Sequence, residues 1–209
     1  MFALAYTLYY LTNHYPVIEP KLLPMTMIDR VTPFLPYTVL IYISEYIYFI
    51  FVYFSLRNYD NINRYLYSFF LLQSVSCFVF AVYPTIYPRE LFPISQELPF
   101  WLQGVWGWLR TQDAPTNCFP SLHVSSVYLS ALAFRTDGPD HQGKDLASKI
   151  KYWIFMSWGT LIALSTLTTK QHYLADIMSG LTLSLAFHWW FHRKQAYSRT
   201  AFAQASVAS

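Results

Sequence analysis

The chain has 209 residues, of which 55% are hydrophobic and 12% are charged, and the apolar residues fall in long blocks. This composition excludes an ordinary water-soluble globular domain and favours a single membrane domain. The formal net charge of +3 does not indicate nucleic-acid binding, because the basic residues are scattered over loops without a base-stacking platform.

In chain order, the first element is a short apolar segment at residues 2–11. We expect a tilted first span there and no cleavable signal peptide, because no basic region precedes it. A membrane-crossing helix needs about 20 mostly apolar residues. Five further stretches approach that length, namely residues 34–56, 65–83, 119–134, 152–169 and 173–192. Residues 100–109 are apolar but too short to span, and they predict a helix lying in the membrane interface.

The sequence therefore predicts an all-α polytopic membrane bundle of about six transmembrane helices, with the interfacial helix over one face. Residues 1–195 would form one membrane-embedded domain, and residues 196–209 a flexible tail. Glu45 and Gln73 fall inside expected spans, where we interpret them as hydrogen-bonding partners between helices. The two cysteines, Cys77 and Cys118, predict neither a disulfide nor a zinc site.

Two polar stretches interrupt the apolar blocks. Residues 120–123 (Pro-Ser-Leu-His) and 172–176 (His-Tyr-Leu-Ala-Asp) each open an apolar stretch, and alternating spans place both on one membrane face. The opposite face carries more basic residues: Arg57, Arg64, Arg135, Lys144, Lys149, Lys151, Arg193, Lys194 and Arg199. Because Lys and Arg mark the cytoplasmic side, we expect an integral protein of the cell membrane with a cytoplasmic N-terminus. The polar stretches would then face the extracytoplasmic or periplasmic side.

Titratable groups beside lipid are costly, so their default interpretation is functional. His172 and Asp176 are four residues apart, and on a helix their side chains can touch. A carboxylate that accepts the proton of one ring nitrogen leaves the lone pair of the other nitrogen free to attack. We therefore predict His172 as a nucleophile, Asp176 as its orienter and His123 as the acid that protonates a departing oxygen.

Three further residues are candidates for binding a phosphate. Ser121 lies near an expected helix start, where its hydroxyl and free backbone N–H groups could hold anionic oxygens. Lys170 and Arg89 fall on the same membrane face and could neutralise a phosphoryl group. The alternative for both is an interface anchor whose charged end reaches the lipid headgroups.

These motifs resemble those of the type 2 phosphatidic acid phosphatase superfamily. Besides the Pro-Ser-Leu-His stretch, Ser165, His172 and Asp176 follow the Ser-x6-His-x3-Asp spacing of that family. The resemblance implies a six-helix membrane core, a phospho-histidine intermediate on His172 supported by Asp176, and proton donation by His123. It implies no metal and no cofactor.

The chain also departs from the family pattern. Leu122 stands where the family has Gly, and Thr166 stands where an Arg usually follows the Ser. The upstream Lys-x6-Arg-Pro motif lacks its lysine and is matched only by Arg89, while Lys170 is a candidate substitute for the missing arginine. Residues 119–123 and 170–173 are closer to the branch that includes inositol phosphorylceramide synthases, which move a phosphorylated headgroup between lipids.

The leading hypothesis is an integral-membrane, metal-independent lipid phosphatase that cleaves a lipid phosphate ester through a phospho-histidine. The alternative is a lipid headgroup phosphotransferase, of the sphingolipid or phospholipid synthase type, in which an alcohol acceptor excludes water from the same residues. More remote alternatives are a haem-binding protein with histidine ligands and a non-catalytic lipid-binding relative. The expected partners are a lipid phosphate or phospholipid substrate and the surrounding membrane lipids.

Overall fold

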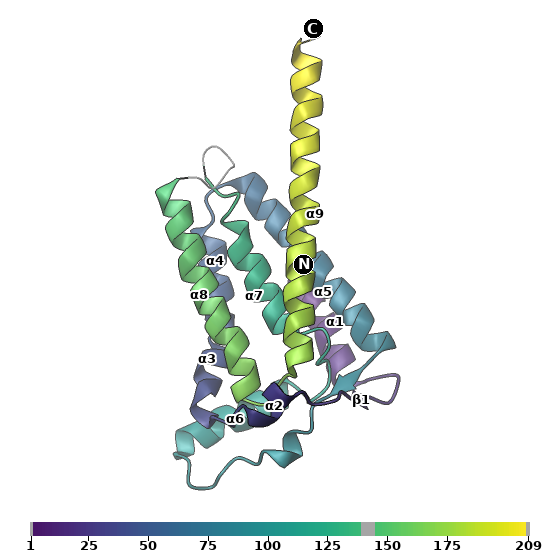
Figure 1. Ribbon diagram of the computed structural model, residues 1–209, viewed down its shortest axis with the longest axis vertical. Coiled ribbons are helices and arrows are strands. Elements are labelled where there is room, and N and C mark those ends of the chain that lie inside the picture. The colour runs from purple at the N-terminus through teal and green to yellow at the C-terminus, as the bar shows by residue number, and fades with distance from the viewer. Residues whose placement is uncertain (1, 139–144, 208–209) are drawn as a thin grey trace.

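The computed structural model describes residues 2–138 and 145–207, and within them the fold is almost entirely helical (Figure 1). Two two-residue strands, β1 (Lys21–Leu22) and β2 (Thr85–Ile86), pair in parallel. Single turns of 3-10 helix form at Pro36–Thr38 and Arg89–Leu91. The helices are α1 (Phe2–His14), α2 (Met27–Val31), α3 (Val39–Ile43), α4 (Glu45–Ser55), α5 (Tyr59–Val82), α6 (Phe100–Gln112), α7 (Leu122–Ala133), α8 (Leu146–Thr168) and α9 (Leu174–Val207).

The central helix is α7, which packs against α4, α5, α8 and α9. Small residues such as Ser125, Ser126 and Ala131 are fully or almost fully buried on it and let the neighbouring helices approach closely. On α8, Gly159 lies against Val127 of α7 in the same way. Each of the six apolar stretches expected to span is helical over most of its length, so the all-α prediction is confirmed.

The number of spans is not borne out to the same extent. Within the described part of the chain, two helical segments are long and apolar enough to cross a membrane, Pro36–Ser55 and Tyr59–Val82. With 13 and 12 residues, α1 and α7 are too short to cross alone. All six expected segments are thus helical, but only two of the helices in the described part of the chain are long and apolar enough to count as membrane spans.

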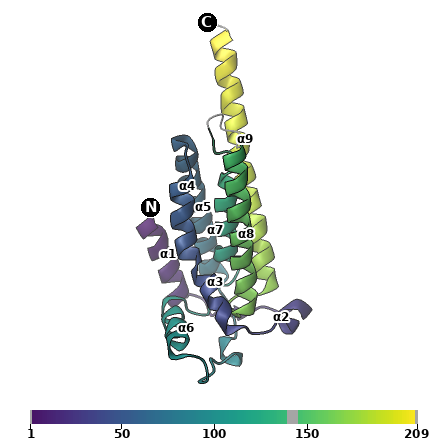
Figure 2. The same ribbon diagram turned by 90° about the vertical axis from the view of Figure 1, so that its left-hand side faces the viewer.

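Helices α6 and α2 lie at one end of the bundle (Figure 2), and the short β ladder lies at the same end (Figure 1). The helix expected at residues 100–109 forms as α6, and its Trp106 is buried with the indole N–H donating to the Pro36 carbonyl at 3.1 Å. The β ladder was not expected, because two-residue strands leave no pattern in the hydrophobic residues. It joins the segment after α1 to the segment after α5, and so helps to close this end.

At the other end of the bundle, helix α9 extends beyond the other helices (Figure 1). Helix α9 continues to Val207, through most of the segment for which the sequence predicted a flexible tail. That segment contains several alanines, which favour helix more than any other residue.

A methyl group at Gly180 is expected to disturb the contact between α9 and α7. It would lie 2.5 Å from the Ser121 carbonyl oxygen and 3.1 Å from the Val124 side chain. We expect Gly180→Ala to cost about 1–3 kcal/mol of stability, because backbone in a packed interface must move. Thermal unfolding in detergent measures it. Gly107→Ala on α6 is the matched control, since its methyl group would meet no atom within 4 Å.

Candidate active site

The two polar stretches come together where α7 and α9 begin. The Ser121 hydroxyl caps α7 by accepting the Val124 N–H at 3.3 Å. The Ser121 backbone N–H donates to the Asp176 carbonyl in the first turn of α9 at 3.1 Å. The start of one helix is therefore fixed against the start of the other. This explains how motifs about 50 residues apart in the sequence reach one place.

His172 and Asp176 make the expected contact. His172 Nδ1 lies 3.3 Å from Asp176 Oδ2 and 3.1 Å from the Cys118 carbonyl oxygen. Both of these neighbours are acceptors, so Nδ1 carries the ring proton and the lone pair resides on Nε2. Asp176 is fully buried and also accepts the Tyr173 N–H at 2.8 Å, which fixes the carboxylate. The geometry suits a nucleophilic imidazole nitrogen.

His123 lies beside His172, with 5.5 Å between the ring centroids. Its Nδ1 is hydrogen-bonded to Glu45, and its Nε2 lies 2.5 Å from the Tyr42 hydroxyl. That hydroxyl donates to Asp113 Oδ2 at 3.3 Å, so its oxygen is left to accept from Nε2. Both nitrogens of His123 then donate, as in a protonated imidazole, which is the form that a general acid requires.

Glu45 belongs to the candidate active site, although the sequence did not predict it there. Its second carboxylate oxygen accepts the Ser126 hydroxyl at 3.2 Å, so Glu45 bonds α4 to α7 as expected for an interhelical partner. The prediction of an interhelical bond is confirmed, but its main partner is the candidate acid His123. The available signal was a carboxylate in the middle of an apolar stretch, which is costly unless paired.

A buried ion pair joins the segment after α5 to the end of α6. Arg89 donates to the Asp113 carbonyl oxygen at 2.6 Å and to Asp113 Oδ2 at 2.9 Å, while Tyr9 donates to Oδ1 at 2.5 Å. Burial by itself would raise the pKa of Asp113, but the charge of Arg89, the nearby histidines and the hydrogen bond from Tyr9 together outweigh it and hold that pKa below its usual value. The Arg89 Nε–H finds no partner in the described part of the chain. It remains available to a ligand oxygen.

Asp113→Asn is expected to lower the free energy of unfolding at pH 7 by about 1.5–3 kcal/mol, the scale of a hydrogen bond to a charged group. Because folding lowers the pKa of Asp113, its contribution is complete above the unfolded pKa of about 4 and is lost as the pH falls further. Denaturation midpoints at pH 7, 5 and 3 measure this. The difference between wild type and variant should shrink below about pH 4, and an unchanged difference at pH 3 would contradict the assignment.

Lys170 is placed differently from the other candidates. It follows α8 in the left-handed conformation (φ 56°), and its amino group donates to the carbonyl oxygens of Asp29 and Thr32 at 2.8 and 2.6 Å. The Asp29 carboxylate accepts the Leu174 N–H at 2.7 Å. Lys170 and Asp29 therefore brace the turn that carries His172, and the Lys170 amino group is directed to α2.

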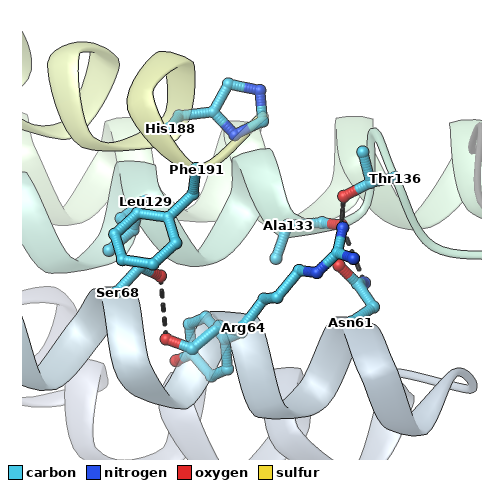
Figure 3. Close-up of a pocket in the computed structure, with 9 residues that line it drawn as sticks. Asn61, Arg64, Ser68, Leu129, Ala133, Thr136, His188 and Phe191 are labelled. Atoms are coloured by element: carbon cyan, nitrogen blue, oxygen red, sulfur yellow. Dashed lines mark hydrogen bonds between the residues drawn. The ribbon is translucent and has the colours of Figure 1, made fainter. Parts of the chain in front are cut away.

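Two cavities of very different size border α7. The larger, of about 580 Å³, is lined mainly by apolar and aromatic side chains of α1 and α3 to α7, with His123, Glu45 and Asp113 at its wall. Its volume lies in the range of small-molecule sites, about 300–1,000 Å³. The smaller, of about 40 Å³, lies at the opposite end of α7 beside Arg64 and His188 (Figure 3). It has room only for a few water molecules, so the large cavity is the candidate substrate chamber.

Comparison with known proteins agrees with this geometry. The family model of the PAP2 superfamily matches residues 83–200, more than half of the chain. The chain belongs to the PAP2 superfamily. It is therefore an enzyme of the phosphoesterase type, with a phosphatase or phosphotransferase activity on a phosphate ester. Neither the curated proteins nor the solved structures gave a match.

Proposed function

We propose that the protein is an integral-membrane lipid phosphatase that works without a metal, through a phospho-histidine on His172. One observation carries the proposal: the buried Asp176 holds Nδ1 of His172 while the ring of His123 lies beside it. An oriented nucleophile next to a proton donor is the arrangement that cleavage of a phosphate ester requires.

The proposed reaction has two steps. First, His172 Nε2 attacks phosphorus and the bond between phosphorus and the lipid oxygen breaks. The lipid oxygen keeps the electron pair of that bond and receives a proton from His123 Nε2. The leaving oxygen would occupy the place that the Tyr42 hydroxyl holds on Nε2. Second, His123 removes a proton from water, which attacks the phospho-histidine and releases inorganic phosphate. Asp176 stabilises the positive charge that His172 gains in the first step.

The phosphoryl oxygens are proposed to bind at Arg89. Its Nε–H has no hydrogen-bond partner in the described part of the chain, and its ion-pair partner Asp113 accepts the Tyr42 hydroxyl that contacts His123. A fixed cation supplies most of its benefit where charge develops in the transition state. Ser121 and Lys170 are proposed to act mainly by holding the two motifs in place.

Two observations support a lipid as the substrate. The chamber of about 580 Å³ has a largely apolar wall and reaches His123, the residue proposed to protonate the leaving alcohol. Large apolar side chains are also exposed on α4, α5, α8 and α9, for example Phe54, Phe78, Trp153 and Trp189. Apolar surface of this kind marks contact with a membrane. The excess of Lys and Arg at the opposite end supports a site on the extracytoplasmic side.

Headgroup transfer is the second candidate, favoured by the burial of the nucleophile. The His172 side chain is only 6% exposed, so a bound alcohol could exclude water from the phospho-histidine. A transferase would use the same first step, and the acceptor alcohol would lose its proton to His123 in the second.

The test is to incubate purified protein in detergent and chelator with a panel of lipid phosphates and phospholipids labelled in the headgroup. The hydrolase version predicts labelled inorganic phosphate, inhibited by vanadate, which mimics five-coordinate phosphorus. Label found in a new lipid, with little free phosphate, would establish the transferase instead. Complete loss of turnover in chelator that returns with added metal would contradict the metal-free mechanism.

A further inference from the structure

A thiol lies beside the proposed nucleophile. Cys118 immediately precedes residues 119–123 and is fully buried, and its Sγ–H donates to the Pro115 carbonyl oxygen at 3.3 Å. Its Sγ, a ring nitrogen of His172 and an Asp176 carboxylate oxygen all lie within 4.8 Å of one another. The proposed reaction uses the histidine and the carboxylate but leaves the thiol without a function.

The three groups match the ligands that zinc prefers. A thiolate, an imidazole and a carboxylate at bond lengths of about 2.0–2.3 Å lie roughly 3.3–3.8 Å apart around a tetrahedral ion. His172 Nδ1 and Asp176 Oδ2 are already 3.3 Å apart. A contraction of about 1 Å at Sγ would complete the set, with the fourth position open to water.

A second observation points to a ligand at this place. Asp176 is fully buried, yet its Oδ1 has no hydrogen-bond partner in the described part of the chain. The carboxylate can therefore offer an ion Oδ1 as well as Oδ2, which also accepts the Tyr173 N–H. A thiolate and a carboxylate would also neutralise a divalent ion, so burying the complex leaves no net charge uncompensated.

We propose that Cys118, His172 and Asp176 form an inhibitory site for a soft divalent cation such as Zn²⁺. On binding, the Cys118 thiol releases its proton to solvent, and the ring proton of His172 moves from Nδ1, which now binds the metal, to Nε2. The lone pair proposed to attack phosphorus is thereby lost. The inhibitory part rests on the proposed function, whereas the metal site itself does not.

Metal binding is tested without turnover, by adding Co²⁺ to the full-length protein in detergent. We expect an intense near-ultraviolet band from thiolate-to-cobalt charge transfer. The band should be absent from Cys118→Ser and from Asp176→Asn but present in Cys77→Ser, which removes the other buried thiol. Cys118→Ala repeats the test should the serine variant fold poorly. A band of equal strength in a folded Cys118 variant, or no band in wild type, overturns the proposal.

Inhibition is tested by titrating Zn²⁺ into the lipid phosphate assay and then adding chelator. Wild type and Cys77→Ser should lose turnover and recover it, while Cys118→Ser should need at least about tenfold more Zn²⁺ to halve its own metal-free turnover. Equal inhibition of Cys118→Ser contradicts the proposal. A protein that shows the Cys118-dependent band but has no activity would refute the phosphatase function and support the metal site. An active protein without the band would support the phosphatase function and refute the metal site.

Discussion

His172→Ala is expected to lower turnover of a lipid phosphate by about 10⁴- to 10⁶-fold, the range found when a covalent nucleophile is removed. The reason is that neither Asp176 nor His123 can replace the nitrogen that forms the bond to phosphorus. Phosphate release at saturating substrate measures the loss, and it should appear in the rate constant for turnover.

The covalent intermediate gives a second readout of the same variant. A short incubation of wild type with substrate labelled in the phosphoryl group should leave label on the protein that is labile in acid and stable in alkali. His172→Ala should carry none. His188→Ala, on the same helix at the opposite end of the bundle, is the matched control and should label as wild type does. Label that survives in His172→Ala would place the nucleophile elsewhere.

Glu45→Ala is expected to slow turnover by about 10²- to 10⁴-fold, the usual contribution of general acid catalysis. Glu45 bonds His123 Nδ1, and no other carboxylate bonds that nitrogen in the described part of the chain. Without it the protonated ring loses its counter-charge and its orientation. We therefore expect turnover to fall more than substrate binding weakens, and the basic limb of the pH–rate profile to move to lower pH.

The controls for Glu45 separate positioning from folding. Gln73→Ala removes another polar group from the wall of the same chamber and should change turnover little. Glu45→Asp keeps the charge on a shorter side chain and should recover part of the rate. A substrate with a leaving group that needs no proton, such as a nitrophenyl phosphate ester, should be much less sensitive to Glu45→Ala. Equal loss on both kinds of substrate would show that Glu45 is merely structural.

The local parts of this molecule could be predicted from its sequence. Long apolar blocks gave the helices, and the i, i+4 spacing of His172 and Asp176 gave their contact, because one helix turn fixes both. The turn of α9 that bears Asp176 also receives the Ser121 N–H, which brings His123 alongside.

The contacts that depend on packing between distant segments could not be predicted. Glu45 and Tyr42 reach His123 only because α4 packs against α7 and α3 packs against α8, and nothing in their local sequence pattern predicts that partner. Lys170 could be placed near His172 from the sequence, but its backbone conformation and the nearby carbonyl oxygens of Asp29 and Thr32 decide where its amino group points. Of the expected spans, two are long and apolar enough in the described part of the chain to cross a membrane, because apolar composition alone does not decide whether a helix crosses it.

The hydrogen bonds among Asp29, Lys170 and Leu174 join a part of the chain that the family model matches to a part that it does not match. The family model begins at residue 83, whereas Asp29, Tyr42 and Glu45 all precede it. A fragment starting at residue 83 would keep every signature residue, yet it would lack the support of the turn before α9 and the counter-ion of His123. The set of residues that contacts His123 and the turn before α9 thus extends beyond the region that the family model matches. A chimera that exchanges only the matched region should inherit the motifs without their function.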